Sequence, residues 1–256
     1  APGSTPAAQS PAAGAAQPCT PLETRDANGA GQRPASPGQT RACGVRSDAA
    51  YDVQVVARGL SKPWAVEPLP DGSFLVTEKE GNLRIVSATG QIGEPITGVP
   101  AVDARGQGGL LDVALSPSFA TDRTIFWSFT EPREGGNGTS VGRGVLSGDG
   151  RRLDGVRVIL HTRPTYNNNM HFGSRLAFGP DGNLYVTMGE RSAVETRPQA
   201  QALDSHLGKV LRVTRDGAAP PDNPFVGQAG ALPEIWSIGH RNIQAAAFDP
   251  EGNLWE

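Results

Sequence analysis

Residues 63–86 read PWAVEPLPDGSFLVTEKEGNLRIV, and this stretch decides the expected fold. A short apolar run leads into the turn Leu-Pro-Asp-Gly, and two further apolar runs follow at Phe74–Thr77 and Leu83–Val86. The runs are rich in β-branched and aromatic residues, are too short for helices, and are bounded by Gly, Pro and Asp. The stretch therefore predicts strands joined by tight turns.

The same strand–turn–strand pattern recurs three more times along the chain, as GLLDVALSPSFATDRTIFWSFT, SRLAFGPDGNLYVTMGE and IQAAAFDPEGNLWE. The turn prolines of the four units are Pro70, Pro117, Pro180 and Pro250, at intervals of 47, 63 and 70 residues. Such intervals are typical of β-propeller blades that carry insertions of varying length. The alternative is a β-rich domain with ordinary hairpins, which four recurrences disfavour. Other apolar runs predict strands at Val53–Val56, Ile125–Phe129, Leu184–Thr187 and Val210–Val213.

Two regions are expected: an arm at residues 1–50 and a partial propeller at residues 51–256. The arm is rich in Pro, Ala and Gly and buries too little apolar surface to order itself, so it should be flexible. Four units do not close a ring, and the last stops at Leu254-Trp255-Glu256. Because an open propeller leaves unpaired strand edges, we expect this chain to be part of a longer protein.

Two cysteines in the arm, Cys19 and Cys43, indicate an oxidising compartment if they form a disulfide. A pair of free thiols is the alternative. The chain begins at Ala1 without an initiator Met or a leader, as a processed exported protein does. We therefore expect a periplasmic or secreted location.

Composition excludes several functions. The chain contains 33 glycines and 22 prolines, consistent with many turns, and its formal net charge is −3. That charge gives no electrostatic basis for binding nucleic acid, and no apolar run approaches the ~20 residues of a membrane span. A sugar or another neutral small molecule is a better candidate ligand than a polyanion.

One His and one Glu form a candidate catalytic pair. His171 follows the asparagine-rich stretch NNNM and precedes an apolar strand, so it should lie in a loop at one end of a blade. Glu190 ends the next predicted strand, and antiparallel neighbours bring such ends together. The carboxylate would fix the imidazole tautomer and leave the other nitrogen to accept a proton. The alternatives are a structural His, with Glu190 paired to Arg191 or Arg175.

Two strips offer ligand-binding groups. Residues 237–244, SIGHRNIQ, include Arg241 and Asn242, and an Arg presents a planar fork of donors suited to an anionic planar ligand. Residues 106–112, GQGGLLD, place Gln107 among glycines that let a ligand approach the backbone. The alternative for both strips is a structural turn or a contact between blades.

Taken together, PW…LPDG…LVTE, GQGGLLD, HFGSRL…GER, LGKVLR…DNPF and EIWS.GHRN resemble the soluble quinoprotein glucose dehydrogenases, and more closely the bacterial aldose sugar dehydrogenases. The resemblance extends from about Glu23 to Glu256, with the motifs in the family's order. It implies a six-bladed, all-β propeller, of which this chain supplies about the first four blades. It also implies pyrroloquinoline quinone (PQQ) and Ca²⁺ as cofactors.

The resemblance assigns roles to individual residues. His171 corresponds to the general base, Glu190 to the acidic residue that orients it, and Gln107, Arg241 and Asn242 to groups that contact the quinone. The implied reaction oxidises an aldose at C1 to a lactone, with hydride transfer to the quinone and re-oxidation by an external electron acceptor.

The chain also departs from the family pattern. Met170 stands where the glucose enzymes have an acidic residue, and Ile243 where the family usually has Pro. The family's Ca²⁺ ligands are expected beyond Glu256, so no metal ligand is assigned in this chain. The competing hypothesis is a non-catalytic propeller that binds a protein or a glycan.

Overall fold

The computed structural model describes residues 22–25, 43–44 and 47–256. The chain divides into two units, residues 1–54 and 55–256, and every helix and strand of the described residues lies in the second. Most of the predicted arm lies outside the described residues. So does Cys19, and its pairing with Cys43 stays a prediction.

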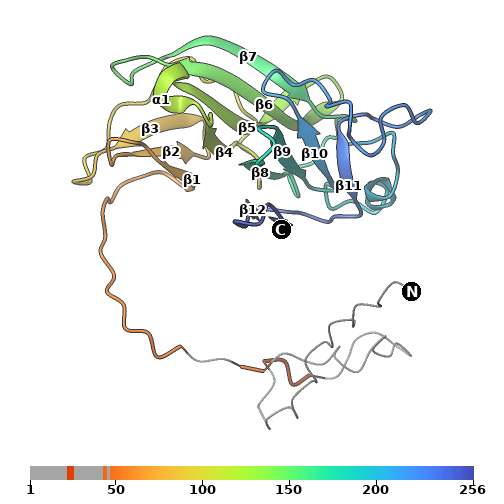
Figure 1. The fold of residues 1–256 in the computed structure, drawn as a ribbon, viewed down its shortest axis with the longest axis horizontal. Helices are drawn as coiled ribbons and strands as arrows, with labels where there is room; N and C mark the ends of the chain where they lie inside the picture. Colours follow the sequence, from red (N-terminus) through yellow and green to blue (C-terminus); the bar gives the residue numbers. More distant parts are fainter. Residues whose placement is uncertain (1–21, 26–42, 45–46) are drawn as a thin grey trace, which may run out of the picture. The chain divides into compact units, whose positions relative to one another are not determined.

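Within the described residues, thirteen strands form four antiparallel sheets that follow one another in chain order (Figure 1). The first contains β1 (Pro63–Pro68), β2 (Phe74–Glu78) and β3 (Asn82–Val86). The second contains β4 (Leu110–Leu115), β5 (Thr124–Arg133), β6 (Gly136–Leu146) and β7 (Leu153–His161). The third contains β8 (Gly173–Phe178), β9 (Leu184–Met188), β10 (Lys209–Val213) and β11 (Ile235–Ile238), and the fourth β12 (Ala247–Phe248) and β13 (Leu254–Trp255). The only helices among these residues are α1 (Phe119–Asp122) and the 3₁₀ helix η1 (Arg197–Ala200), so the all-β prediction is confirmed.

The predicted repeat is visible in the turns. In three of the four units the same backbone hydrogen bond closes the Pro-containing turn, from Leu69 N to Ser73 O, from Gly179 N to Asn183 O and from Asp249 N to Asn253 O, at 2.8–3.0 Å. Each turn contains a glycine at positive φ, of which Gly72 at 83° is an example, a conformation that other residues rarely adopt. The second unit inserts α1 into this turn.

One predicted strand is wrong. Residues 53–56 have no strand hydrogen bonds, and Val53 and Val56 are exposed at 81% and 43%. An alternating apolar run becomes a strand only when a neighbour supplies a ladder of hydrogen bonds. Among the described residues no strand pairs with this segment.

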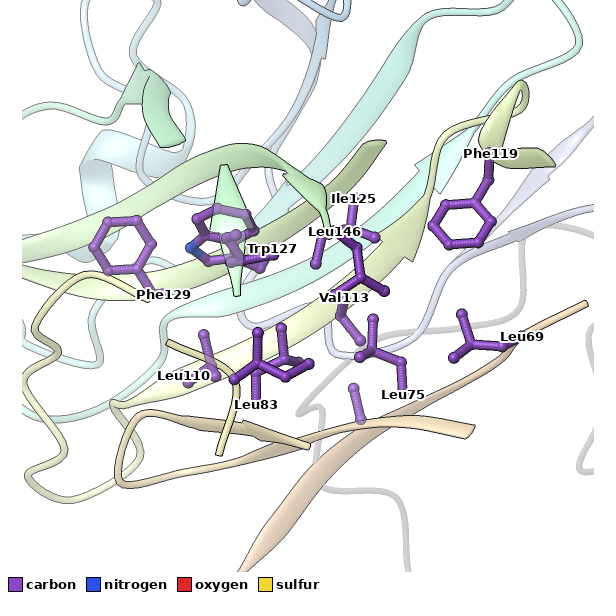
Figure 2. Close-up of a cluster of buried hydrophobic side chains, with 13 residues drawn as sticks. Leu69, Leu75, Leu83, Leu110, Val113, Phe119, Ile125, Trp127, Phe129 and Leu146 are labelled. Carbon is purple, nitrogen blue, oxygen red and sulfur yellow. The ribbon is translucent and has the colours of Figure 1, made fainter. Parts of the chain in front are cut away.

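The hydrophobic cores lie between successive sheets. One cluster joins Leu75 and Leu83 of the first sheet to Leu110, Ile125 and Trp127 of the second (Figure 2). A second cluster joins the second sheet to the third. Side chains along β5 alternate between the two faces, so Ile125 and Trp127 enter the first cluster while Phe126 enters the second. Each of the first three sheets is therefore covered by a neighbour in the chain.

A buried hydroxyl group links each of the first two sheets to the next, and a third hydroxyl links the third sheet to the segment before β12. Thr77 in β2 accepts the N–H of Ala65 at 3.0 Å, where β1 has a bulge, and donates to the carbonyl of Leu111 in β4 at 2.6 Å. Two further residues repeat this arrangement. Ser128 in β5 links Asp112 to the Ser174 carbonyl, and Thr187 in β9 links Arg175 to the Ile243 carbonyl, at 2.7–2.9 Å. We call Thr77, Ser128 and Thr187 the bridging hydroxyls.

Thr77→Val should reduce the free energy of unfolding by about 3 kcal/mol. The change preserves side-chain shape but leaves a buried N–H and a buried carbonyl unpaired, at about 1–3 kcal/mol each. Thr89→Val is the control, because Thr89 is exposed and its hydroxyl contacts only Ser87, and its effect should stay below about 0.5 kcal/mol. Denaturant titration of the full-length protein measures both. Equal effects would show that the bridging hydroxyl has no special importance.

Candidate active site

Two loops meet at the end of the sheets where β4 and β8 begin. Residues 167–172, which we call the His171 loop, lie against the Gln107 segment. The backbone N–H of Gln107 donates to the Asn169 carbonyl at 2.7 Å, and its side-chain Oε1 accepts the backbone N–H of His171 at 2.8 Å. Gly106 permits this approach, since a Cβ there would lie 2.4 Å from the Asn169 carbonyl oxygen.

His171 and Glu190 form a buried pair. The imidazole Nδ1 lies 2.6 Å from Glu190 Oε1, and the two residues are 8% and 3% exposed. The other carboxylate oxygen, Oε2, accepts the backbone N–H of Ser192 at 3.0 Å, which fixes the carboxylate plane. A carboxylate oxygen in its ionised form only accepts hydrogen bonds, so such a contact would place the imidazole proton on Nδ1. Among the described residues no group hydrogen-bonds to Nε2, which leaves that nitrogen free to accept a proton from a ligand.

The Arg241–Asn242 strip lies directly beside this pair. Asn242 pairs with Gly189 in an isolated antiparallel bridge, and the Arg241 carbonyl accepts the Glu190 N–H at 2.8 Å. Asn242 Oδ1 also accepts the backbone N–H of Gly173 at 3.0 Å. The strip therefore contacts the chain just after His171 and at Glu190, although it lies about fifty residues further along the chain.

Three side chains at this site have donors without a protein partner in the described part of the chain. The guanidinium of Arg241 is exposed and has no hydrogen bond or ion pair there. Gln107 and Asn242 each use only the side-chain oxygen, so their amide NH₂ groups remain available. Unpaired donors on three converging segments suit a ligand rich in carboxylate and carbonyl oxygens.

The structural alternatives for Glu190 are wrong. Arg175 instead forms an ion pair with the buried Asp112 at 2.6 Å, and its guanidinium lies over the ring of Trp64. Arg191 turns away from Glu190 and donates to backbone carbonyls and to Asn137.

Arg191 and Asn137 contribute to the site's framework and were not predicted. Asn137 opens a formal glycosylation sequence, Asn-Gly-Thr, yet it is fully buried and donates to Asp103 and to the Asn168 carbonyl. No sequence pattern indicates either role. Arg191 stands beside a carboxylate, which suggests a surface ion pair, and backbone carbonyl partners have no residue-type signature.

Backbone strain gathers around the pair. His171, Arg191 and Ser192 all have positive φ angles, of 49°, 70° and 62°. Such values are costly for residues other than glycine and persist only when surrounding contacts hold them. The contacts described above therefore hold the His–Glu pair in a conformation that the local sequence disfavours.

Comparison with known proteins identifies the family. The family model described as glucose/sorbosone dehydrogenase matches residues 60–256. The chain belongs to this family. The predicted resemblance is thereby confirmed, and it includes every residue of the candidate site.

Individual relatives agree with this assignment. The chain is 43% identical over 210 residues to the aldose sugar dehydrogenase YliI of Escherichia coli, covering 81% of this chain and 56% of the relative. It is 31% identical to quinoprotein glucose dehydrogenase B of Acinetobacter calcoaceticus, covering 80% and 47%. Among solved structures, the PQQ-bound aldose sugar dehydrogenase of Streptomyces coelicolor matches with a TM-score of 0.69 and 35% identity, covering 79% and 57%. The chain thus spans about half the length of these relatives.

Two features are absent from the described residues. No group of three or more His, Cys, Asp or Glu side chains within them is arranged to hold a metal ion. No helix in that part of the chain is long and apolar enough to cross a membrane.

The buried Asp112 predicts a pH-dependent stability. Burial raises its pKa to about 6 from the ordinary value of 3.8, although Arg175 opposes the shift. Between these pH values the folded protein holds a proton that the unfolded chain has released, so stability falls as pH rises. The free energy of unfolding of the wild type, relative to Asp112→Asn, should fall by up to about 3 kcal/mol between pH 4 and pH 7. A difference that is constant or grows with pH would contradict this assignment.

Proposed function

We propose that the whole protein is a PQQ-dependent aldose dehydrogenase that oxidises sugars at C1 to lactones. The buried His171–Glu190 pair carries this proposal, together with the unpaired donors beside it. The activity is the one named for the Escherichia coli and Acinetobacter relatives, and PQQ is the cofactor named for the Streptomyces structure. The four sheets of this chain would be successive blades of a six-bladed ring completed by further sequence.

The quinone fits the donors that this chain supplies. PQQ is a planar anion with carboxylate and carbonyl oxygens, and when bound it accepts the hydride equivalent from the sugar. Arg241 would contribute charge and a fork of N–H donors, while Asn242 and Gln107 would each contribute an amide NH₂. Because Gln107 and Asn242 also hold the backbone at His171 and Gly173, the groups that bind the cofactor also position the base.

The proton steps follow from the pair's geometry. His171 Nε2 takes the proton of the sugar's C1 hydroxyl as C1 loses its hydride. Glu190 keeps Nδ1 as the donor and stabilises the imidazolium that forms, as an orienting carboxylate does in other base–carboxylate pairs. The exposed Met170 side chain lies directly before the base and adds an apolar contact for the sugar.

Ca²⁺, an external electron acceptor and export to the periplasm or medium belong to the same proposal. The Ca²⁺ requirement rests on the family resemblance, since the described residues contain no acidic cluster for the ion. Export rests on the Cys19 and Cys43 pair, because a disulfide between them would form and persist in an oxidising compartment. The competing binding-only propeller provides no reason to bury a His–Glu pair with one nitrogen open.

His171→Gln in the full-length protein should lower kcat by about 10²–10⁴, the usual contribution of a general base. PQQ affinity, measured by absorbance titration, should stay near that of the wild type because the three proposed quinone contacts are unchanged.

His161→Gln is the matched control. His161 lies on β7, its side chain is half exposed, and it pairs only with Glu131. Its kcat should equal that of the wild type. Unchanged turnover in His171→Gln would remove the assigned base and with it the mechanism.

A further inference from the structure

Arg191 is an unusual buried cation. It is 1% exposed, and it forms no ion pair with any carboxylate of the described residues. Its guanidinium lies 4.2 Å from the centre of the Phe172 ring. Burial lowers its pKa to about 10, and the negative charge of Asp103 only partly offsets that effect. A buried charge of this kind is costly unless all of its donors are used.

Its donors are directed at the His171 loop. Nε donates to the Met170 carbonyl at 3.1 Å, and Nη2 donates to the Asn168 carbonyl at 2.8 Å. The backbone N–H of Arg191 donates to the His171 carbonyl at 3.3 Å. Since the N–H of Gln107 binds the Asn169 carbonyl, each of the four consecutive carbonyls of residues 168–171 accepts a hydrogen bond from Arg191 or Gln107.

A second set of bonds fixes Arg191 itself. Nη1 and Nη2 donate to the main-chain and side-chain oxygens of Asn137 at 3.2 and 2.6 Å. Asn137 in turn donates to Asp103 at 2.8 Å and to the Asn168 carbonyl at 2.9 Å. Arg191, which directly follows Glu190, therefore joins Asn137 of β6 and the His171 loop into one hydrogen-bond network.

We infer that Arg191 is a positioning residue that sets the His171 imidazole in its productive orientation by holding the carbonyls of residues 168 and 170. The inference rests on the proposed function for its effect on turnover. His171 has a positive φ, and this loop conformation requires external support. Only a guanidinium can do this, because its planar fork reaches several acceptors at once and a lysine ammonium cannot span them.

Arg191→Lys in the full-length, quinone-loaded protein tests the inference. A base displaced by about 1 Å costs up to about 10² in rate, so kcat should fall ten- to a hundredfold. KM should stay near the wild-type value, because the lost interaction acts in the transition state. Hydrogen exchange gives a readout that does not require turnover. The peptide containing residues 167–173 should exchange faster in the variant.

Arg212→Lys is the matched control. Arg212 is 5% exposed and binds Asp181, Asp222 and Asn223. Its register partner Tyr185 lies five residues before Glu190, roughly 17 Å along an extended strand. This variant should lose stability without changing kcat or exchange in the loop. Asn137→Ser, which removes one acceptor of Arg191, is a milder second variant, and it should lower kcat less than Arg191→Lys does.

The outcomes separate the two proposals. If the wild type turns over no sugar, the proposed function fails, and faster loop exchange in Arg191→Lys alone still supports the positioning role. Wild-type kcat and wild-type exchange in both Arg191→Lys and Asn137→Ser would overturn the inference. An equal loss of kcat in Arg212→Lys would also overturn it, because the effect would then be one of stability alone.

Discussion

The bridging hydroxyls are the interaction on which this structure depends. Each lies on the second strand of its sheet, opposite the bulge in the first strand. Each accepts a backbone N–H of that first strand and donates to a carbonyl of the next sheet or segment, so one side chain satisfies two buried backbone groups. The bulge sets the direction in which the first strand of each sheet begins. The hydroxyl's bond to the next sheet or segment fixes the distance between the two. Because Thr187 holds the Ile243 carbonyl, it also fixes the neighbouring Asn242, which belongs to the candidate site.

The site follows from this spacing of strand ends. The Gln107 segment precedes β4, the His171 loop precedes β8, Glu190 follows β9, and the Arg241 strip pairs alongside. Backbone N–H and carbonyl groups of each of these segments form hydrogen bonds with another of them. The donors left over, on Gln107, Arg241 and Asn242, are the ones that we propose bind the ligand. In this proposal the same few side chains bind the ligand and position the base, and their contacts with the backbone allow the positive φ angles to persist there.

Local features of the fold could be predicted from the sequence. The residues of a Pro-Asp-Gly turn favour the turn conformation by their own backbone preferences, so the turns at Pro70 and Pro180 form as expected. The run Val53–Val56 has only the apolar pattern of a strand, and without a partner strand it forms no ladder of backbone hydrogen bonds. The meeting of Gln107, His171, Glu190, Arg241 and Asn242 could be predicted because family motifs place them together. The role of Arg191 could not, since its partners are backbone carbonyls that no residue type marks.

The most direct test of the account is sugar oxidation by the full-length protein. The purified protein is reconstituted with PQQ and Ca²⁺, and reduction of an artificial electron acceptor is followed with a panel of aldoses, including one deuterated at C1. The account predicts turnover that requires added PQQ and is slower with the deuterated sugar. No sugar-dependent reduction, with no quinone absorbance retained after desalting, would contradict it and favour a propeller that only binds.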